Sequence, residues 1–276
     1  MDVSEYYDQM HTYTWRDSAF ELHSGIHHHA IHRFLQAPDG SFSPDTIHTL
    51  LAAHLPRLPG FRGLDAGCGY GGTCFRLLPL TGGVWTGITI SATQRRLAAA
   101  RAVELGFEAR AHFARRSYDD PQEGSFHAIL AIESLAHSRD PAASLTNLAR
   151  HLRPGGVFLL VDDMPRPGLP AEEAGWLAEF RRYWHCPVLP MADGWRAMLA
   201  AEGLELAHDQ DLLPLTRPRP MEMLETAWVE HSARLPARRS EGFGAVAEGE
   251  LGGIRLEQLM RRGAVEYRLM VARRPG

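Results

Sequence analysis

The sequence predicts an α/β protein in which a mostly parallel β-sheet carries helices on both faces. Short, continuously apolar segments alternate with amphipathic ones from residue 61 onward, as expected for parallel strands buried on both faces. A glycine-rich loop at 67–72 directly follows the first of these strands. The chain has 276 residues, 45% of them hydrophobic and 22% charged, which suits one large domain with a substantial insertion.

Capping and turn residues divide the chain into elements as far as residue 163. Ser43, Ser91 and Asp140 are expected N-caps, with Pro44 and Pro141 at the first helical positions. Gly106 is the expected C-terminal stop of the second long helix. The expected order is a helix at 44–55, a strand at 61–66, a helix at 72–80, a strand at 84–90, a helix at 91–106, strands at 111–117 and 126–134, a helix at 140–152, a turn at 153–156 and a strand at 157–163.

The regular alternation of apolar strands and amphipathic helices ends after residue 164. Residues 165–200 are expected to be helical, and 204–213 and 266–274 to form an antiparallel edge pair of strands. The intervening 214–262 is expected to be an insertion with one or two helices. We therefore divide the chain into an N-terminal lid segment (1–43), a ligand-binding core (44–164) and a lid insertion with closing strands (165–276).

Composition narrows the function classes. The net charge of −4 argues against a nucleic-acid-binding surface. All 29 basic residues are arginine, so neither a Schiff-base lysine nor a P-loop lysine is available. The three cysteines form no disulfide framework, which favours a cytoplasmic location. We expect no signal peptide and no membrane-spanning segment.

The glycine loop LDAGCGYGG, residues 64–72, admits two interpretations. G-x-G-x-x-G is the fingerprint of a nicotinamide-dinucleotide site, whereas acid-x-G-x-G-x-G, beginning at Asp65, indicates another cofactor. A dinucleotide site usually has an acid at the end of the second strand. That strand ends in the uncharged segment TIS at 89–91. The second interpretation is therefore preferred.

Five segments occur in order at ordinary spacings: LDAGCGYGG, GITISATQ, ILAIESLAHSRDP, LRPGGVFLLVDDM and YRLMVARRPG. Together they resemble the class I S-adenosylmethionine (SAM)-dependent methyltransferases over residues 45–275. GITISATQ is similar to the sterol, prenyl-diphosphate and cyclopropane-fatty-acid branch, and ESLAHSRDP to rebeccamycin-like sugar O-methyltransferases. The resemblance implies a Rossmann-like, seven-stranded, mostly parallel sheet with a helical N-terminal segment, a helical lid insertion and SAM as cofactor.

The resemblance also implies where the methyl donor binds. Loop glycines let the backbone approach the ligand, Asp65 accepts from its ammonium group, and the following helix start receives its carboxylate. Ile90 offers an apolar face to the adenine, and Ser91 and Gln94 bond the ribose. Ser117 and Tyr118 hold the adenine by a loose match, and a plain turn over residues 118–121 is an equal alternative. The expected donor-binding residues are Asp65, Gly67, Gly69, Gly71, Thr89, Ile90, Ser91, Gln94, Ser117, Tyr118 and Glu133.

Four residues are expected to act on the acceptor: Glu133, His137, Asp162 and Asp163. If the segment after Glu133 is helical, Glu133 and His137 share one face, and His137 takes a proton from a hydroxyl acceptor. Glu133 holds the acceptor or stabilises a carbocation on an alkene. Structural roles are the alternatives for both residues. The sugar enzymes carry two adjacent histidines, and Ala136 stands in the place of the first. Strand alternation places one of Asp162 and Asp163 in the cleft without specifying which.

The expected substrate-binding residues belong to the aromatic lid: Tyr7, Trp15, His23 and Trp184. They predict a hydrophobic small-molecule acceptor, methylated on carbon or oxygen in specialised metabolism. A cyclase on the same fold and a non-catalytic SAM-binding partner protein are the alternatives. We expect no nucleic-acid or membrane partner, and a homodimer remains open. His28 and His32 lack further ligands at metal-binding spacing, so no metal is expected.

Overall fold

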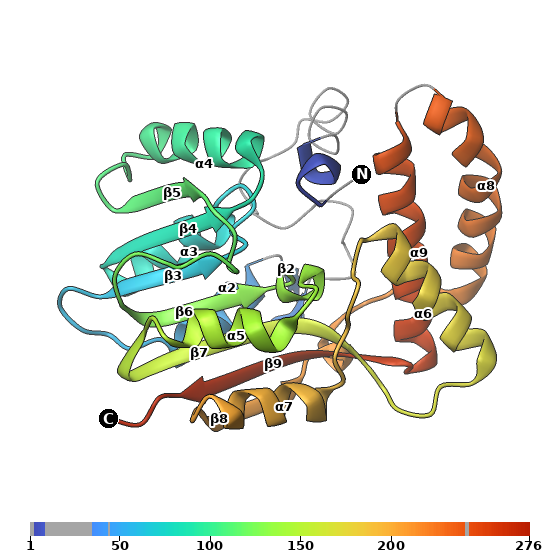
Figure 1. Cartoon of the computed structure of the whole chain (residues 1–276). Coiled ribbons are helices and arrows are strands. Elements are labelled where there is room, and N and C mark those ends of the chain that lie inside the picture. Colours follow the sequence, from blue (N-terminus) through green and yellow to red (C-terminus); the bar gives the residue numbers. More distant parts are fainter. Residues whose placement is uncertain (1–2, 9–34, 44, 241–242) are drawn as a thin grey trace.

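The computed structural model describes residues 3–8, 35–43, 45–240 and 243–276. Its centre is a seven-stranded sheet with the order β5-β4-β3-β6-β7-β9-β8 (Figure 1). The first five of these strands run parallel, and β9 is antiparallel to both neighbours. The strands are β3 (Arg62–Ala66), β4 (Val84–Thr89), β5 (Ala111–Arg115), β6 (Phe126–Ile132), β7 (Leu152–Pro165), β8 (Glu205–Asp211) and β9 (Val265–Arg273). The predicted fold class is confirmed.

Helices cover both faces of the sheet and one of its ends. The insertion at 214–262 contains two helices, as expected, joined through residues 241–242. The helices are α2 (Thr46–His54), α3 (Gly72–Thr81), α4 (Ala92–Glu104), α5 (Pro141–Ala149), α6 (Ala171–Tyr183), α7 (Ala192–Ala201), α8 (Met221–Ser240) and α9 (Gly244–Arg262). Within the described part of the chain, no helix is long and apolar enough to cross a membrane.

Two local predictions are wrong. Ser43 does not cap α2, because it pairs with Leu35 in a small hairpin of β1 (Leu35–Gln36) and β2 (Phe42–Ser43). The helix instead begins at Thr46 after Asp45. The expected turn at 153–156 lies within β7, where the pairing of β6 jumps from Leu152 to Val157. The chain bulges there without ending the strand.

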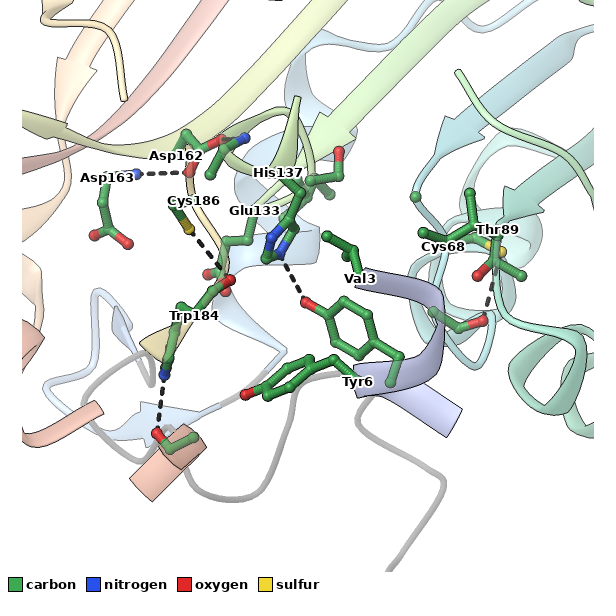
Figure 2. A pocket seen from close by; sticks show the side chains of 18 of the residues that line it. Val3, Tyr6, Cys68, Thr89, Glu133, His137, Asp162, Asp163, Trp184 and Cys186 are labelled. Atoms are coloured by element: carbon green, nitrogen blue, oxygen red, sulfur yellow. Dashed lines mark hydrogen bonds between the residues drawn. The ribbon is translucent and has the colours of Figure 1, made fainter. Parts of the chain in front are cut away.

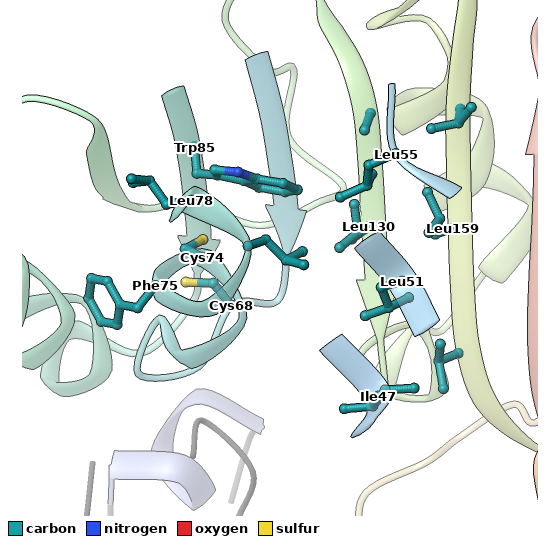
Figure 3. Packing of buried hydrophobic residues seen from close by; sticks show 14 of the residues in the cluster. Ile47, Leu51, Leu55, Cys68, Cys74, Phe75, Leu78, Trp85, Leu130 and Leu159 are labelled. Carbon is teal, nitrogen blue, oxygen red and sulfur yellow. The ribbon is translucent and has the colours of Figure 1, made fainter. Parts of the chain in front are cut away.

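Alternate side chains of the central strands pack into two separate hydrophobic cores, one on each face of the sheet. Leu130 of β6 and Leu159 of β7 pack with α2, α3 and α4 on one face (Figure 3). Ile129 and Leu160, one position away, pack with α5 and α7 on the other face. This period of two, with both faces apolar, explains the continuously hydrophobic strands of the sequence.

Three helices gather beyond one end of the sheet. α6, α8 and α9 stand together there, whereas α7 packs against the sheet itself (Figure 1). α6 and α9 share a core that includes Phe180, Cys186 and Leu256, and α8 contacts α9 through a smaller cluster around Leu251. The helical residues 3–8 lie between this group and the sheet. The arrangement leaves a space at the carboxyl ends of the parallel strands.

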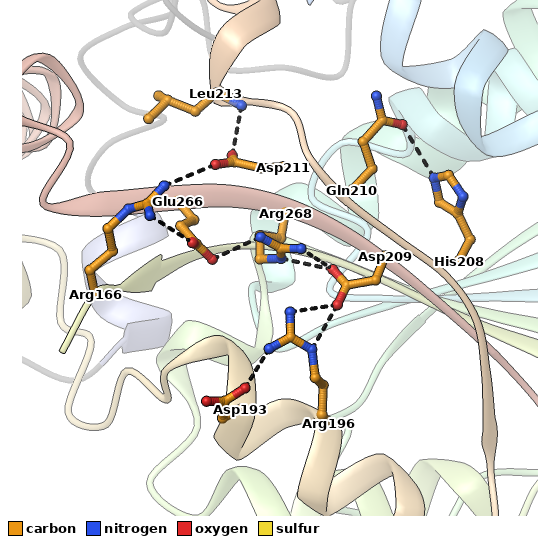
Figure 4. A network of polar contacts seen from close by, with 10 residues as sticks. All are labelled: Arg166, Asp193, Arg196, His208, Asp209, Gln210, Asp211, Leu213, Glu266 and Arg268. Carbon is orange, nitrogen blue, oxygen red and sulfur yellow. Dashed lines mark hydrogen bonds and ion pairs between the residues drawn. The ribbon is translucent and has the colours of Figure 1, made fainter.

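An ion-pair network ties the antiparallel edge of the sheet together (Figure 4). Asp209 of β8 accepts from Arg268 of β9 and from Arg196 of α7, whose Nη2 lies 2.6 Å from Asp209 Oδ2. Arg268 Nη1 also lies 3.0 Å from Glu266, which in turn pairs with Arg166. Charged side chains on an edge strand discourage pairing with another chain.

Candidate active site

A cavity of about 830 Å³ lies at the carboxyl ends of the parallel strands, beneath α6, α9 and residues 3–8. Ligands bind at this edge in open parallel sheets. Of the expected site residues, those that line the cavity are Asp65, Gly67, Gly69, Thr89, Ile90, Gln94, Ser117, Tyr118, Glu133, His137, Asp162, Asp163, Tyr7 and Trp184. Trp15, His23, His28 and His32 lie outside the described residues, so the structure does not place them.

Asp65 is a buried carboxylate at the end of the cavity where the methyl donor is expected to bind. It sits in β3, only 2% exposed, and burial raises the pKa of its carboxyl group to about 7. The Cys74 thiol, 3.7 Å away, is the hydrogen-bond donor the structure gives it. A carboxylate desolvated in this way gains strongly from a cation placed in the cavity.

The three loop glycines have different reasons to be glycine. A Cβ on Gly67 would lie 2.4 Å from Ser134 Cβ, and one on Gly71 2.6 Å from the Phe113 ring. These two positions are therefore required by the protein's own packing. Gly69 has a φ of +52° and no atom within 4 Å of a built Cβ, so its cavity side is open to a ligand. Gly71 does not line the cavity, and its expected contact with the donor stays a prediction.

The end of β4 is organised by hydrogen bonds between its own side chains. Thr89 Oγ1 donates to Gln94 Oε1 at 2.7 Å, and both side chains line the cavity. Ser91 does not line it: its hydroxyl accepts from the Gln94 N–H as the cap of α4 and donates to Asp8. The Ser91 hydroxyl therefore serves as a helix cap here, and its expected ribose contact stays a prediction.

Tyr118 joins the turn after β5 to the loop after β6. Its hydroxyl donates to the Ser134 carbonyl at 3.3 Å, and its own carbonyl accepts from Asn147 Nδ2 at 2.6 Å. The neighbouring Ser117 hydroxyl accepts from the Asp119 N–H at 3.0 Å, as in an ordinary turn. The segment is thus a turn whose first residues line the cavity, and the adenine contact expected of Ser117 and Tyr118 stays a prediction.

Glu133 follows β6 with a backbone that side-chain-bearing residues rarely adopt. Its φ is +50°, and its carboxylate accepts from the Tyr267 hydroxyl at 2.7 Å. The helix expected after it is a single 3-10 turn, Leu135–His137. Glu133 and His137 therefore share a cavity, but not one face of an α-helix. Strain of this kind persists where surrounding structure enforces it, often at functional sites.

His137 is held between two segments that are distant in sequence. Its Nε2 lies 2.8 Å from Tyr7 Oη and its Nδ1 3.3 Å from the His185 carbonyl (Figure 2). A carbonyl oxygen can only accept, so Nδ1 carries the proton in this contact and Nε2 accepts from Tyr7. Burial raises the pKa of the Tyr7 hydroxyl well above 10, which keeps it a donor at neutral pH.

Asp162 and Asp163 both line the cavity, so alternation does not send one of them to solvent. Asp162 has a positioning role: its Oδ2 accepts from the Ala136 N–H at 3.1 Å and its Oδ1 from the Asp163 N–H at 3.0 Å. These bonds fix the turn that carries His137. Figure 2 shows the Asp163 side chain directed away from Asp162.

The far wall of the cavity is built by the lid helices. Trp184 lies against α9, where a Cβ on Gly252 would approach its ring to 2.1 Å, and its Nε1 donates to the Gly249 carbonyl at 2.9 Å. Arg219 Nη2 lies 2.6 Å from Glu257 Oε1, and Glu257 is almost fully buried. Arg219 and Glu257 therefore neutralise each other within this wall.

Several lining residues escaped the sequence analysis. They are Tyr6, His48, Thr73, Arg219, Glu257 and Tyr267. Tyr6 has an adjacent signal, because it precedes the expected Tyr7 in an aromatic segment. Tyr267 has none, since its partner Glu133 lies 134 positions away.

Comparisons with known proteins agree with this site. A family profile described as a methyltransferase domain matches residues 64–158. The O-methyltransferase rstn1 of Aspergillus nomiae is 32% identical over 59% of this chain and 72% of its own length. The 27-O-demethylrifamycin SV methyltransferase of Amycolatopsis mediterranei is 31% identical over 82% of this chain and 81% of its own. The chain belongs to the SAM-dependent methyltransferase family.

A solved structure shares the fold at lower identity. The [4+2]-cyclase SpnF superposes with a TM-score of 0.66 over 84% of this chain and 81% of that chain, at 23% identity. Structural similarity at this identity supports a shared fold alone.

The residues present fit SAM as the cofactor. The desolvated Asp65 carboxylate complements an ammonium group, and the open side of Gly69 admits a ligand against the backbone. Ile88 and Ile90 supply apolar surface next to the polar pair of Thr89 and Gln94. The chain is thus a SAM-dependent methyltransferase of small molecules, and the acceptor is the open question.

Proposed function

We propose that this enzyme methylates a hydroxyl oxygen of a largely apolar small molecule, and that Tyr7 and His137 remove the proton. The observation that carries this proposal is the 2.8 Å contact between Tyr7 Oη and His137 Nε2 inside the cavity. Relatives named as an O-methyltransferase and as a 27-O-demethylrifamycin SV methyltransferase support oxygen as the acceptor atom. A role in specialised metabolism is part of the same proposal.

His137 is arranged to receive a proton at Nε2. Its Nδ1–H is directed to the His185 carbonyl, which also stabilises the imidazolium that would form. Tyr7 donates to Nε2, and its oxygen retains lone pairs for an acceptor hydroxyl. A proton can therefore pass from the acceptor through Tyr7 to His137 without a tyrosinate forming. This relay compensates for Ala136, which stands where the sugar enzymes resembled by this sequence carry the first of two adjacent histidines.

SAM, when bound, supplies a methyl group on a positively charged sulfur, whose transfer to an oxygen leaves a neutral thioether. The proton released by the acceptor ends on His137, so charge balances. The remaining task of the chain is alignment and exclusion of water. Residues 3–8 contribute to both, because Ser4 Oγ donates to the Ile90 carbonyl at 3.1 Å while Tyr7 reaches His137.

The acceptor class follows from the far wall. Tyr6, Phe180, Trp184, Val246 and Ile254 line it, and two of its ionic groups, Arg219 and Glu257, pair with each other. Such a surface favours apolar molecules that present few polar groups. We include among the candidates hydroxylated polyketide and aromatic compounds of the size that fills part of the 830 Å³ cavity.

Carbon methylation is the second candidate, and one contact favours it. The Glu133 carboxylate, held by Tyr267 at 2.7 Å, stands in the cavity where it would stabilise a cation developing on an alkene. A cyclase activity on this fold has only architectural support. A protein with cyclase activity would bind SAM and transfer no methyl group.

The test uses methyl-labelled SAM with pairs of apolar acceptors that carry either a hydroxyl group or an alkene. We expect labelled ether products, a loss of about 100-fold or more in kcat for His137→Asn, and little change for the matched control His112→Asn, whose side chain is exposed on β5. Label in carbon-methylated alkenes, with Glu133→Gln more damaging than His137→Asn, would replace the proposal by the second candidate.

A further inference from the structure

A buried histidine on α2 stands at the donor end of the cavity and has no role so far. His48 is 3% exposed and lines the cavity together with Ile47 and Thr73. Its Nε2 lies 3.4 Å from Thr73 Oγ1. Its Nδ1 has no hydrogen-bond partner among the described residues. A buried polar atom without a partner is costly and calls for an explanation.

The start of α3 lies beside this histidine. Thr73 is the second residue of α3, and the cap position before the helix is Gly71, which has no side chain to accept from the first turn. The first turn also contains no acidic residue. Its N–H groups therefore form an electropositive end that anions favour. His48 supplies the second, independent feature directed to the same place.

Two charged residues near His48, Asp45 and Arg76, pair with each other. Asp45 Oδ1 lies 3.9 Å from His48 Nδ1, beyond hydrogen-bond distance, and pairs instead with Arg76 Nε at 3.2 Å. Burial lowers the pKa of His48 to about 4, with Asp45 opposing and Arg76 assisting this shift. From the sheet side, Asp65 faces the same cavity. Without an anion next to it, His48 is therefore neutral at pH 7.

The two ends of an amino-acid head group match this arrangement. Cys74 donates to Asp65 Oδ2 and directly follows Thr73. The Asp65 carboxylate, which favours a cation, therefore lies next to the start of α3, which favours an anion. The ammonium and carboxylate groups of the donor are bonded to the same carbon atom. A ligand whose ammonium group meets Asp65 thus places its carboxylate near Thr73 and His48.

We propose that His48 and Thr73, with the first turn of α3, bind the carboxylate of the donor, and that His48 takes up a proton as it does so. The inference rests on donor binding in this cavity and adds a proton-linked carboxylate contact to it. A carboxylate beside the imidazole favours its charged form. Donor binding is then coupled to proton uptake.

The test is calorimetric titration of the full chain with S-adenosylhomocysteine (SAH) at pH 7, in buffers of different ionisation enthalpy. The comparison ligand is its decarboxylated analogue, in which an aminopropyl chain replaces the aminocarboxypropyl chain. Both ligands carry the ammonium group, so any proton released from Asp65 cancels between them. We expect SAH to take up more protons than the analogue, by up to about one per site.

Two variants complete the test. His48→Gln should remove the extra proton uptake and weaken SAH about 10- to 100-fold, the range of a charge-assisted hydrogen bond, while the analogue binds as before. Thr73→Val should weaken SAH selectively without abolishing the uptake, and it keeps the test valid if His48→Gln fails to fold. His112→Gln is the matched control.

Equal proton uptake for the two ligands, or a His48→Gln protein with unchanged SAH affinity, would overturn the inference. Absence of binding by either ligand to the wild-type protein would instead overturn donor binding in the cavity. The two failures are therefore distinguishable.

Discussion

Tyr7 Oη lies 2.8 Å from His137 Nε2, although 130 positions separate the two residues in the chain. The contact joins the N-terminal helical segment to the turn after β6, directly over the cavity. It requires residues 3–8 to be in place before the proton acceptor is complete. Closure of this segment and assembly of the catalytic pair are thus the same structural event in our account.

Removing the Tyr7 hydroxyl should lower the rate of methyl transfer and spare donor binding. For Tyr7→Phe we expect kcat to fall about 100-fold, the lower range for loss of proton transfer. Single-turnover assays with labelled SAM and a hydroxyl acceptor measure the rate, and calorimetry measures SAH affinity. Tyr183→Phe, whose ring packs against Trp228 and does not line the cavity, is the control. A Tyr7→Phe enzyme with wild-type kcat would rule out the relay.

The donor-free protein should lose stability as pH rises. Burial raises the pKa of Asp65 to about 7, so the folded state retains a proton that the unfolded chain releases near pH 4. The free energy of unfolding therefore falls between about pH 4 and 7, by at most roughly 4 kcal/mol, and is level above that range. Asp65→Asn removes this penalty.

Urea unfolding at pH 5 and pH 8 measures the effect. We expect the stability advantage of Asp65→Asn over the wild type to be larger at pH 8 than at pH 5, because the penalty is only partly present at pH 5, whereas the exposed Glu225→Gln should change neither value. An Asp65→Asn protein that is less stable at pH 8 would show that the carboxylate is not desolvated.

Glycine at position 133 should relieve backbone strain. Because Glu133 has a φ of +50°, we expect Glu133→Gly to be about 1 kcal/mol more stable than Glu133→Ala. Both variants lose the contact with Tyr267, so their difference isolates the backbone. Thermal unfolding measures it. Equal melting temperatures for the two variants would contradict the left-handed conformation.

Alanine substitutions at two adjacent glycines of α9 should have opposite effects on stability. A Cβ at Gly252 would lie 2.1 Å from Trp184, whereas at Gly253 the nearest ring atom is 3.8 Å away. Gly252→Ala should destabilise by about 1–3 kcal/mol and raise the KM of the acceptor by displacing Trp184. Gly253→Ala should be neutral or stabilising by about 0.5–1 kcal/mol, as expected for alanine in a helix. Thermal unfolding and initial rates test both, and similar effects at the two positions would refute the packing argument.

The edge network predicts unequal roles for two aspartates. Asp209 contacts both Arg196 and Arg268 and is 16% exposed, whereas Asp193 contacts Arg196 alone and is 94% exposed. Asp209→Asn should cost about 1–3 kcal/mol because Arg196 and Arg268 each lose one of their two carboxylate partners, and Asp209 is the less exposed one for Arg196. Asp193→Asn should cost less than about 0.5 kcal/mol. Urea unfolding in low and high salt compares them, and equal losses would contradict the network.

The sheet was predictable because its strands carry a local signal. Leu130 and Ile129, or Leu159 and Leu160, are apolar on both sides of the strand, and this pattern needs no knowledge of distant residues. The same holds for Ser91 and Asp140, which cap their helices as expected.

The parts of the site that escaped prediction depend on distant contacts. No pattern near Glu133 indicates its positive φ or its bond to Tyr267. Asp8 reaches Ser91 across the fold, and only the tertiary structure brings them together. His48 had a usable signal, because it is a polar residue between Ile47 and Leu51 on the buried face of α2. A buried histidine in such a helix warrants a functional hypothesis.

The donor site is tested most directly by calorimetric titration of SAH into the wild-type protein and Asp65→Asn at pH 8, with NAD as the control ligand. We predict that the wild type binds SAH, that Asp65→Asn binds it at least about 10-fold more weakly through loss of the buried charge contact, and that NAD binds to neither. Binding of NAD, or an Asp65→Asn protein that holds SAH as tightly as the wild type, would contradict the donor site described above.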